Sequence, residues 1–86
     1  MKPIIFSKDA LEQLSEWKKI NPKISLKIVA LITEIAETPF AGTGKPEALK
    51  YNLRGKWSRR ITGEHRLVYE VLEYEIRIIS CKFHYD

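Results

Sequence analysis

The chain has 86 residues, a hydrophobic fraction of 44% and a formal net charge of +4 at pH 7. A chain of this length buries about 60 to 65% of the surface that its unfolded form exposes, which predicts one domain over residues 1–86. No apolar run approaches the roughly 18 to 20 residues of a membrane span, and residues 1–6 are too short for a secretory signal, so we expect a cytoplasmic protein without membrane contacts.

The beginning of the chain predicts a strand followed by a helix. An apolar run over residues 2–6 ends at Ser7, which is a good N-cap residue and is followed by Asp9 in the first helical turn. Apolar side chains then recur at helical spacing, at Leu11, Leu14, Trp17 and Ile20.

A second helix is predicted to follow at once. Asn21-Pro22 ends the first helix and begins the next, because proline is favoured at the first helical position. Thr38-Pro39 ends this second helix. Its apolar side chains form one broad stripe, made of Ile24, Ile28, Leu31, Ile32 and Ile35. Two helices joined this tightly predict a helical hairpin.

The second half of the chain predicts a loop and then a sheet. Residues 40–46 contain two glycines and a proline, which predicts a loop that leads to Glu47. Turn signals at residues 63–64 and 73–74 separate three strand patterns, which predicts an antiparallel meander packed against the helical hairpin in an α+β fold. The single cysteine, Cys81, cannot form an intramolecular disulfide and is expected to be a reduced core residue.

A cluster of positive charge lies between residues 45 and 66, where seven basic residues face only two acids, Glu47 and Glu64. Concentrated positive charge attracts polyanions. A solvated cationic face is the commoner meaning of such a run, but cations in a strand-forming region repel one another unless an anion lies among them. The basic residues are Lys45, Lys50, Arg54, Lys56, Arg59, Arg60 and Arg66.

Strand alternation indicates which of these cations can meet. Side chains point to alternate faces of a strand, and the turn at residues 63–64 makes Arg60 and Arg66 plausible cross-strand neighbours. Two guanidiniums at that separation need a shared anion, for which phosphate oxygens have suitable geometry. Glu64 or Glu70 is the alternative partner for the two arginines.

Candidate proton-transfer groups are few. His84 ends the last predicted strand near solvent, although a lone histidine is more often structural than catalytic. Glu47 follows Pro46 and could equally be an acid at a helix N-terminus. His65 and His84 have no Asp or Cys at ligand spacing, so we expect no metal site and no cofactor.

Three motifs occur in order in the second half of the chain: GKPEAL at residues 44–49, WSRRI at 57–61 and EHRLVY at 64–69, and His84-Tyr85 follows near the C-terminus. Together they resemble the YoeB (Txe/YoeB) toxins of bacterial toxin-antitoxin systems. The resemblance covers nearly the whole chain. It implies a RelE-like fold and an endoribonuclease that cuts mRNA in the ribosomal A site.

The same resemblance implies roles for individual residues. Glu47 resembles the general base that deprotonates the ribose 2'-OH, Arg66 the residue that stabilises the phosphorane, and His84 the general acid for the 5'-oxygen. The residues that resemble supporting phosphate-binding or site-shaping groups are Lys50, Arg60 and Tyr85. The cations expected to contact RNA or the antitoxin are Arg54, Lys56 and Arg59.

The resemblance also implies partners. These are a YefM-like antitoxin with an acidic C-terminal segment, and the A site of the 70S ribosome with its rRNA and mRNA. It leaves monomer and homodimer both open. Asp86 extends the chain beyond the usual His-Tyr terminus, and we expect it to tune the reaction modestly.

Two other functions compete with cleavage. A non-catalytic basic module would bind RNA by stacking on Tyr51 and Trp57 and by contacting phosphates. An inactive protein with the toxin fold would use the cationic surface only to hold an acidic partner. The binding module predicts that replacing Glu47 and His84 leaves the biological effect intact, whereas the inactive protein predicts that no mRNA fragments appear even on programmed ribosomes.

Overall fold

The structure is a computed structural model that describes residues 1–84 of the chain. The elements within this range follow one another as β1 (Ile4–Phe6), α1 (Lys8–Ile20), α2 (Pro22–Glu37), β2 (Glu47–Ala48), the 3-10 helix η1 (Tyr51–Leu53), β3 (Trp57–Arg60), β4 (His65–Val71) and β5 (Ile76–His84). The predicted α+β architecture is confirmed: an N-terminal strand, a helical hairpin, then an antiparallel meander packed against the helices.

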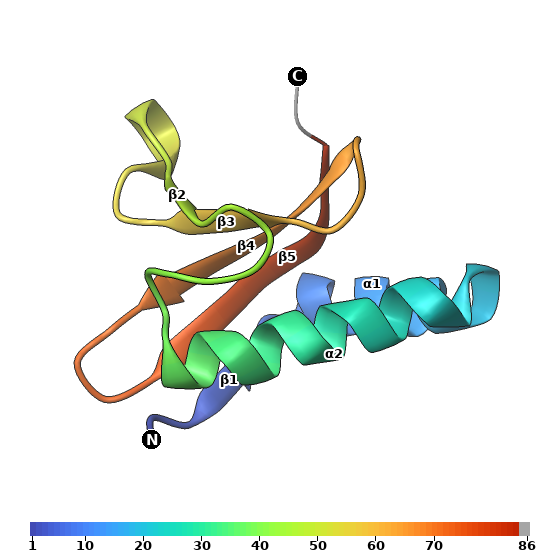
Figure 1. Ribbon diagram of the computed structural model, residues 1–86, viewed down its shortest axis with the longest axis horizontal. Coiled ribbons are helices and arrows are strands. Elements are labelled where there is room, and N and C mark those ends of the chain that lie inside the picture. The colour runs from blue at the N-terminus through green and yellow to red at the C-terminus, as the bar shows by residue number, and fades with distance from the viewer. Residues whose placement is uncertain (85–86) are drawn as a thin grey trace.

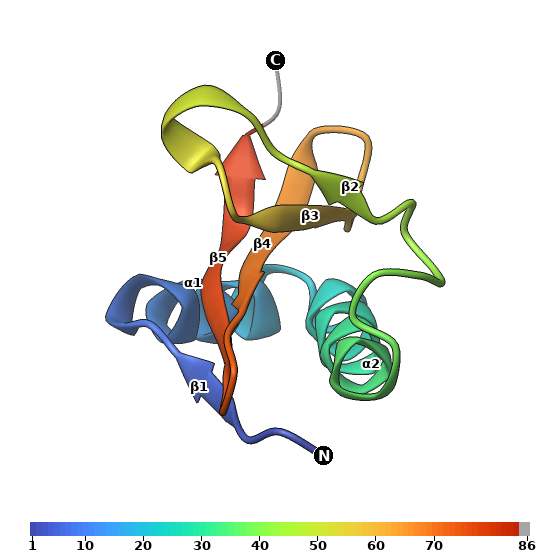
Figure 2. The same ribbon diagram turned by 90° about the vertical axis from the view of Figure 1, so that its left-hand side faces the viewer.

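One sheet contains all the described strands, in the order β1-β5-β4-β3-β2. Strand β1 runs parallel to β5, and every other neighbouring pair is antiparallel. Figures 1 and 2 show both helices on one side of the molecule, and β2, η1 and β3 on the opposite side. The helices therefore do not cover β2 or η1.

The first helix begins where the sequence predicts. The Ser7 hydroxyl accepts a hydrogen bond from the Ala10 amide at 3.0 Å, and the Ser7 amide donates to the Ile78 carbonyl at 2.9 Å. Ser7 thus caps α1 and also ties its start to β5. Of the apolar residues that predict this helix, Trp17 is buried, whereas Leu11 and Ile20 are exposed.

The second helix supplies most of the helical core. Of its predicted stripe, Ile28, Leu31, Ile32 and Ile35 are buried and Ile24 is half-buried, which confirms the stripe. They pack against β-strand residues in a core where each fully buried aliphatic side chain stabilises the fold by about 1.5–3 kcal/mol. The strand residues of this core include Leu67, Tyr69, Ile76, Ile78 and Cys81.

The register between β4 and β5 shifts twice, between Arg66 and Val68 and between Val68 and Tyr69. Side chains of α1 bind the backbone of β5 at this irregularity. The Trp17 indole donates to the Cys81 carbonyl at 2.8 Å, and the Cys81 amide donates to the Gln13 side chain at 2.9 Å. Helix α1 therefore holds the segment of β5 that leads to His84. Neither helix in residues 1–84 is long and apolar enough to cross a membrane.

Candidate active site

Glu47 lies in β2, at the edge of the sheet, and not at the start of a helix. It pairs with Ser58 of β3, so the two side chains lie on the same face of the sheet. The Leu49 amide donates to the Lys56 carbonyl at 2.9 Å and extends the attachment beyond β2. The Glu47 side chain is exposed, so its carboxylate can reach a substrate.

Arg60 and Arg66 lie directly opposite each other on β3 and β4, which confirms their predicted pairing. Arg60 is exposed, whereas Arg66 is only 7% exposed and its Nη1 donates to the Thr62 carbonyl at 3.3 Å. Because alternate residues of a strand share a face, Arg60 lies on the face of Ser58, and therefore of Glu47. A carboxylate and two guanidiniums thus share one face of the sheet.

His84 lies at the neighbouring end of the sheet, on β5. It pairs with His65, and their ring centroids are 5.9 Å apart. The His65 ring in turn packs edge-on against Trp17 of α1, at 5.1 Å. Phe83, not His84, is the residue of β5 that pairs with Arg66. Alternation therefore puts His84 on the helix side, where its Nε2 lies 3.4 Å from a carboxylate oxygen of Glu64.

The cations next to Glu47 lie on the segment around η1. Lys50 and Arg54 are exposed and Lys56 is half-buried. Tyr51 is 91% exposed and has a φ of 58°, a left-handed conformation that costs a non-glycine residue energy. Figures 1 and 2 show this segment projecting on the side away from the helices. It offers cations and an aromatic ring beside the face that carries Glu47.

The expectation that Arg59 contacts RNA or an antitoxin is wrong, because its side chain has no exposed surface. It lies in the core beneath the loop that follows α2, and its ion pair with Glu34 was not predicted. Arg59 shares a strand face with Trp57 and Ile61, and these two apolar neighbours are the signal in the sequence that its side chain points inward. Tyr85 lies outside the described residues.

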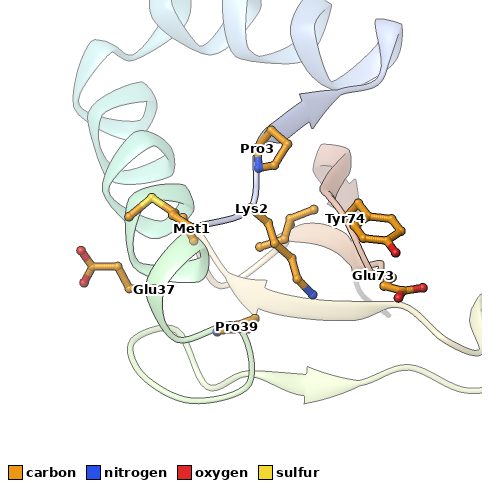
Figure 3. Close-up of a pocket in the computed structure, with 9 residues that line it drawn as sticks. Met1, Lys2, Pro3, Glu37, Pro39, Glu73 and Tyr74 are labelled. Carbon is orange, nitrogen blue, oxygen red and sulfur yellow. The ribbon is translucent and has the colours of Figure 1, made fainter.

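A groove of about 520 Å³ lies elsewhere, at the opposite end of β4 and β5 from His65 and His84. Figure 3 shows it between the N-terminus, the end of α2 and the β4–β5 turn. Its charged lining residues are Lys2, Glu37 and Glu73, a balance that does not suit a polyanion. Residues 1–84 contain no group of three or more His, Cys, Asp or Glu side chains placed to hold a metal ion.

The arrangement can exchange protons beside a bound anion. Glu47 offers a carboxylate, Arg60 and Arg66 offer charged donors on the same face, and His84 offers an imidazole at the adjoining end of the sheet. Bidentate guanidinium donors suit phosphate oxygens. Groups of this kind are those that phosphodiester chemistry requires.

Comparison with known proteins agrees with the motifs. A family model described as the YoeB-like toxin of bacterial type II toxin-antitoxin systems matches residues 6–85. Toxin YoeB of Escherichia coli K12 is 46% identical over 82 residues, covering 95% of this chain and 98% of the relative. Toxin YoeB of Synechocystis is 57% identical over 71 residues, covering 81% and 83%.

Solved structures give the same result. The YoeB dimer from Staphylococcus aureus superposes with a TM-score of 0.89 at 45% identity, covering 98% of each chain. The YoeB-YefM complex from the same organism gives 0.87 at 45% identity, covering 99% of each chain. The chain belongs to the family of YoeB-like toxins of bacterial type II toxin-antitoxin systems.

Proposed function

We propose that this toxin is an endoribonuclease that cleaves mRNA in the A site of the 70S ribosome, and so inhibits translation in the cytoplasm. The observation that carries the proposal is the shared face of Glu47, Arg60 and Arg66. It combines a carboxylate that can act as a base with two cations on one face of the sheet, which are the kinds of group that cleavage of a phosphodiester requires.

The mechanism is an internal attack by the ribose 2'-OH on the adjacent phosphate. Glu47 takes the proton from the 2'-oxygen as that oxygen bonds to phosphorus. Arg66, supported by Arg60 and Lys50, stabilises the negative charge of the phosphorane. The bond to the 5'-oxygen then breaks as His84 protonates that oxygen, leaving a 2',3'-cyclic phosphate and a 5'-hydroxyl. A general acid or base contributes about 10²- to 10⁴-fold to such a reaction.

The proposal requires His84 to turn. In the structure it lies beside Glu64 and His65, on the face opposite to that of Arg66. Its side chain is 60% exposed and lies at the last described position of β5, so a change of the backbone there can turn it by giving up its contacts with Glu64 and His65, without moving a residue of the hydrophobic core. Binding of RNA phosphate next to Arg66 would favour the turned, protonated imidazole by charge attraction.

We also propose a cognate YefM-like antitoxin as partner. The related toxin from S. aureus was solved in complex with YefM, and an acidic antitoxin segment would complement the exposed cations Lys50, Arg54 and Arg60. The S. aureus toxin was also solved as a dimer, and the same assembly for this chain can be measured by light scattering.

The test is cleavage on ribosomes that carry a defined mRNA, with the cut mapped by primer extension. We expect the wild-type protein to cut in the A-site codon, and Glu47→Gln, Arg66→Ala and His84→Gln each to lose about 100-fold or more in rate. Glu73→Gln, an exposed carboxylate in the remote groove, is the matched control and should cut normally.

Two outcomes would reject the proposal. Cleavage by all three variants at the wild-type rate would rule out the proposed mechanism. The absence of any cut by the wild-type protein, with growth inhibition retained in Glu47→Gln, would favour the non-catalytic RNA-binding module. A parallel reaction with naked RNA separates ribosome-dependent cleavage from general ribonuclease activity.

A further inference from the structure

The buried side chain of Arg59 has an acceptor for every one of its donors. A guanidinium has five N–H groups in a rigid planar fork. In this structure Nη1 donates to Glu34 and to the Thr43 carbonyl, Nη2 donates to the Thr38 and Ala41 carbonyls at 2.6 and 2.8 Å, and Nε donates to the Tyr69 hydroxyl at 3.3 Å.

These acceptors converge on one segment of the chain. Three of them are backbone carbonyls of residues 38–43, a stretch without helix or strand. The Tyr69 hydroxyl donates to the Pro39 carbonyl at 2.6 Å and so binds the same segment. Glu34 reaches it as well, by accepting from the amide and the hydroxyl of Thr43. Side chains therefore supply to this segment the hydrogen bonds that backbone pairing supplies in a helix or a sheet.

The segment held by Arg59 leads directly to Glu47. The Gly44 carbonyl accepts from the Arg60 amide at 2.7 Å, and a Cβ on Gly44 would lie 3.1 Å from the Cβ of Arg59. Three residues later Glu47 pairs with Ser58. The position of Glu47 relative to Arg60 therefore depends on how this segment attaches to β3.

Stability alone does not explain a charged residue here. A buried ion pair can often be replaced by well-packed apolar side chains of similar volume without loss of stability. An apolar side chain at residue 59 could fill the space, but it could not bind three carbonyls in fixed directions. The guanidinium, in contrast, fixes the conformation of residues 38–43 by binding their carbonyls.

We propose that Arg59, together with Glu34, is a positioning device that fixes residues 38–46 against β3 and thereby holds Glu47 in register with the Arg60–Arg66 pair. The inference rests on the proposed function for its catalytic consequence, but the attachment itself can be measured without RNA. Arg59 touches no substrate and acts only through Glu47.

The first test is amide hydrogen exchange in Glu34→Ala, with Glu37→Ala as the matched control on the same helix. The reporters are the Arg60 amide, bound to Gly44, and the Leu49 amide, bound to Lys56. We expect both to exchange about tenfold faster or more in Glu34→Ala and to be unchanged in Glu37→Ala. The Ser7 amide, bound to Ile78 at the other edge, should not respond. Unchanged reporter amides in Glu34→Ala would overturn the proposal.

The second test measures cleavage on programmed ribosomes. Glu34→Ala and Arg59→Lys should lower kcat by about tenfold or more with KM little changed, and either change should add almost nothing in a Glu47→Gln background. The control is Ile28→Val, which loosens the core at a position outside this segment and should keep the wild-type kcat. A normal kcat, or losses that simply add to that of Glu47→Gln, would overturn the proposal.

The two tests separate this inference from the proposed function. If the wild-type protein cuts no RNA, the proposed function fails, and the exchange experiment still decides whether Arg59 and Glu34 hold the segment. If Arg59→Lys does not fold, Glu34→Ala decides alone, because Glu34 lies at the surface of α2 with its side chain 34% exposed.

Discussion

Arg60 and Arg66 face each other across β3 and β4, in the directly paired position where side chains approach most closely. Like charges in that position destabilise a sheet by a few tenths to about 1 kcal/mol. Arg66 is also almost buried, so solvent screens the pair poorly on one side. Two guanidiniums held on one face of a sheet attract anions to that face.

The Arg60–Arg66 pair predicts that replacing Arg60 has opposite effects on stability and on cleavage activity. Arg60→Gln should raise the free energy of unfolding by about 0.2–1 kcal/mol, because it removes the repulsion, and should slow cleavage by about 10- to 100-fold. Urea denaturation and primer extension measure the two effects. Arg77→Gln is the control, because Arg77 is exposed on β5 and pairs with Glu75 at 2.6 Å, so it should not stabilise the fold. A less stable Arg60→Gln protein would contradict the prediction.

The proposed role of His84 as general acid predicts that a leaving group which needs no proton restores cleavage when His84 is replaced. A sulfur atom in place of the 5'-oxygen leaves without protonation, so His84→Gln should cleave such a substrate within about tenfold of the wild-type rate. Glu47→Gln should stay slow, because its missing step is removal of the 2'-proton. Single-turnover cleavage of matched oxygen and sulfur substrates on ribosomes measures the difference. Equal defects of His84→Gln on both substrates would exclude the acid role.

Glu34 predicts a pH dependence of stability. Hydrogen bonds from the Thr43 amide and hydroxyl, and then Arg59, hold the pKa of Glu34 below its ordinary value of 4.5. The folded protein therefore binds this proton less tightly than the unfolded chain. The stabilisation is present above pH 4.5 and is lost as the pH falls through the lowered pKa. The stability deficit of Glu34→Gln, measured in urea, should shrink from pH 7 to pH 3; a constant deficit would contradict this.

Cys81 is predicted to be inert in the folded protein. Its side chain is fully buried, and burial raises the pKa of its thiol to about 11. At pH 8 only about one thiol in a thousand is ionised at that pKa, and alkylating reagents cannot reach it. Mass spectrometry should show modification by iodoacetamide at the rate of unfolding, and rapid modification in urea. Fast labelling of the native protein would show that the segment of β5 around Cys81 opens readily.

Local signals in the sequence were sufficient for most elements. Ser7, Asn21-Pro22 and Thr38-Pro39 mark helix boundaries because capping and proline geometry depend on near neighbours. The two-residue period after Lys56 predicts β3 and β4, and with them the pairing of Arg60 and Arg66. These features need no knowledge of distant segments.

Features that depend on distant segments were not predictable in this way. The parallel pairing of β1 with β5 joins residues more than 70 positions apart, such as Ile4 and Ile76. The shifts in register between β4 and β5 decide that Phe83, and not His84, pairs with Arg66. Neither β4 nor β5 contains the glycine that marks one class of bulge, so their sequences do not show where the register shifts.

Arg59 shows the limit of reasoning from charge. Arginine is rarely buried, so the sequence predicts that Arg59 contacts RNA or the antitoxin together with Arg54 and Lys56. Its burial depends on Glu34 and three carbonyls that only the folded chain brings together. The apolar neighbours Trp57 and Ile61 on the same strand face predict the inward direction better than the charge predicts exposure.

The place of β5 between β1 and β4 also sets the order of events during synthesis. Strand β5 leaves the ribosome after the other strands of residues 1–84 and is an inner strand, to which β1, Ser7 and Trp17 all hydrogen-bond. A nascent chain that stops before Ile76 therefore has no partner for β1 and no closed core. We expect such fragments to stay unfolded and to be degraded, so that an interrupted round of translation yields no assembled toxin.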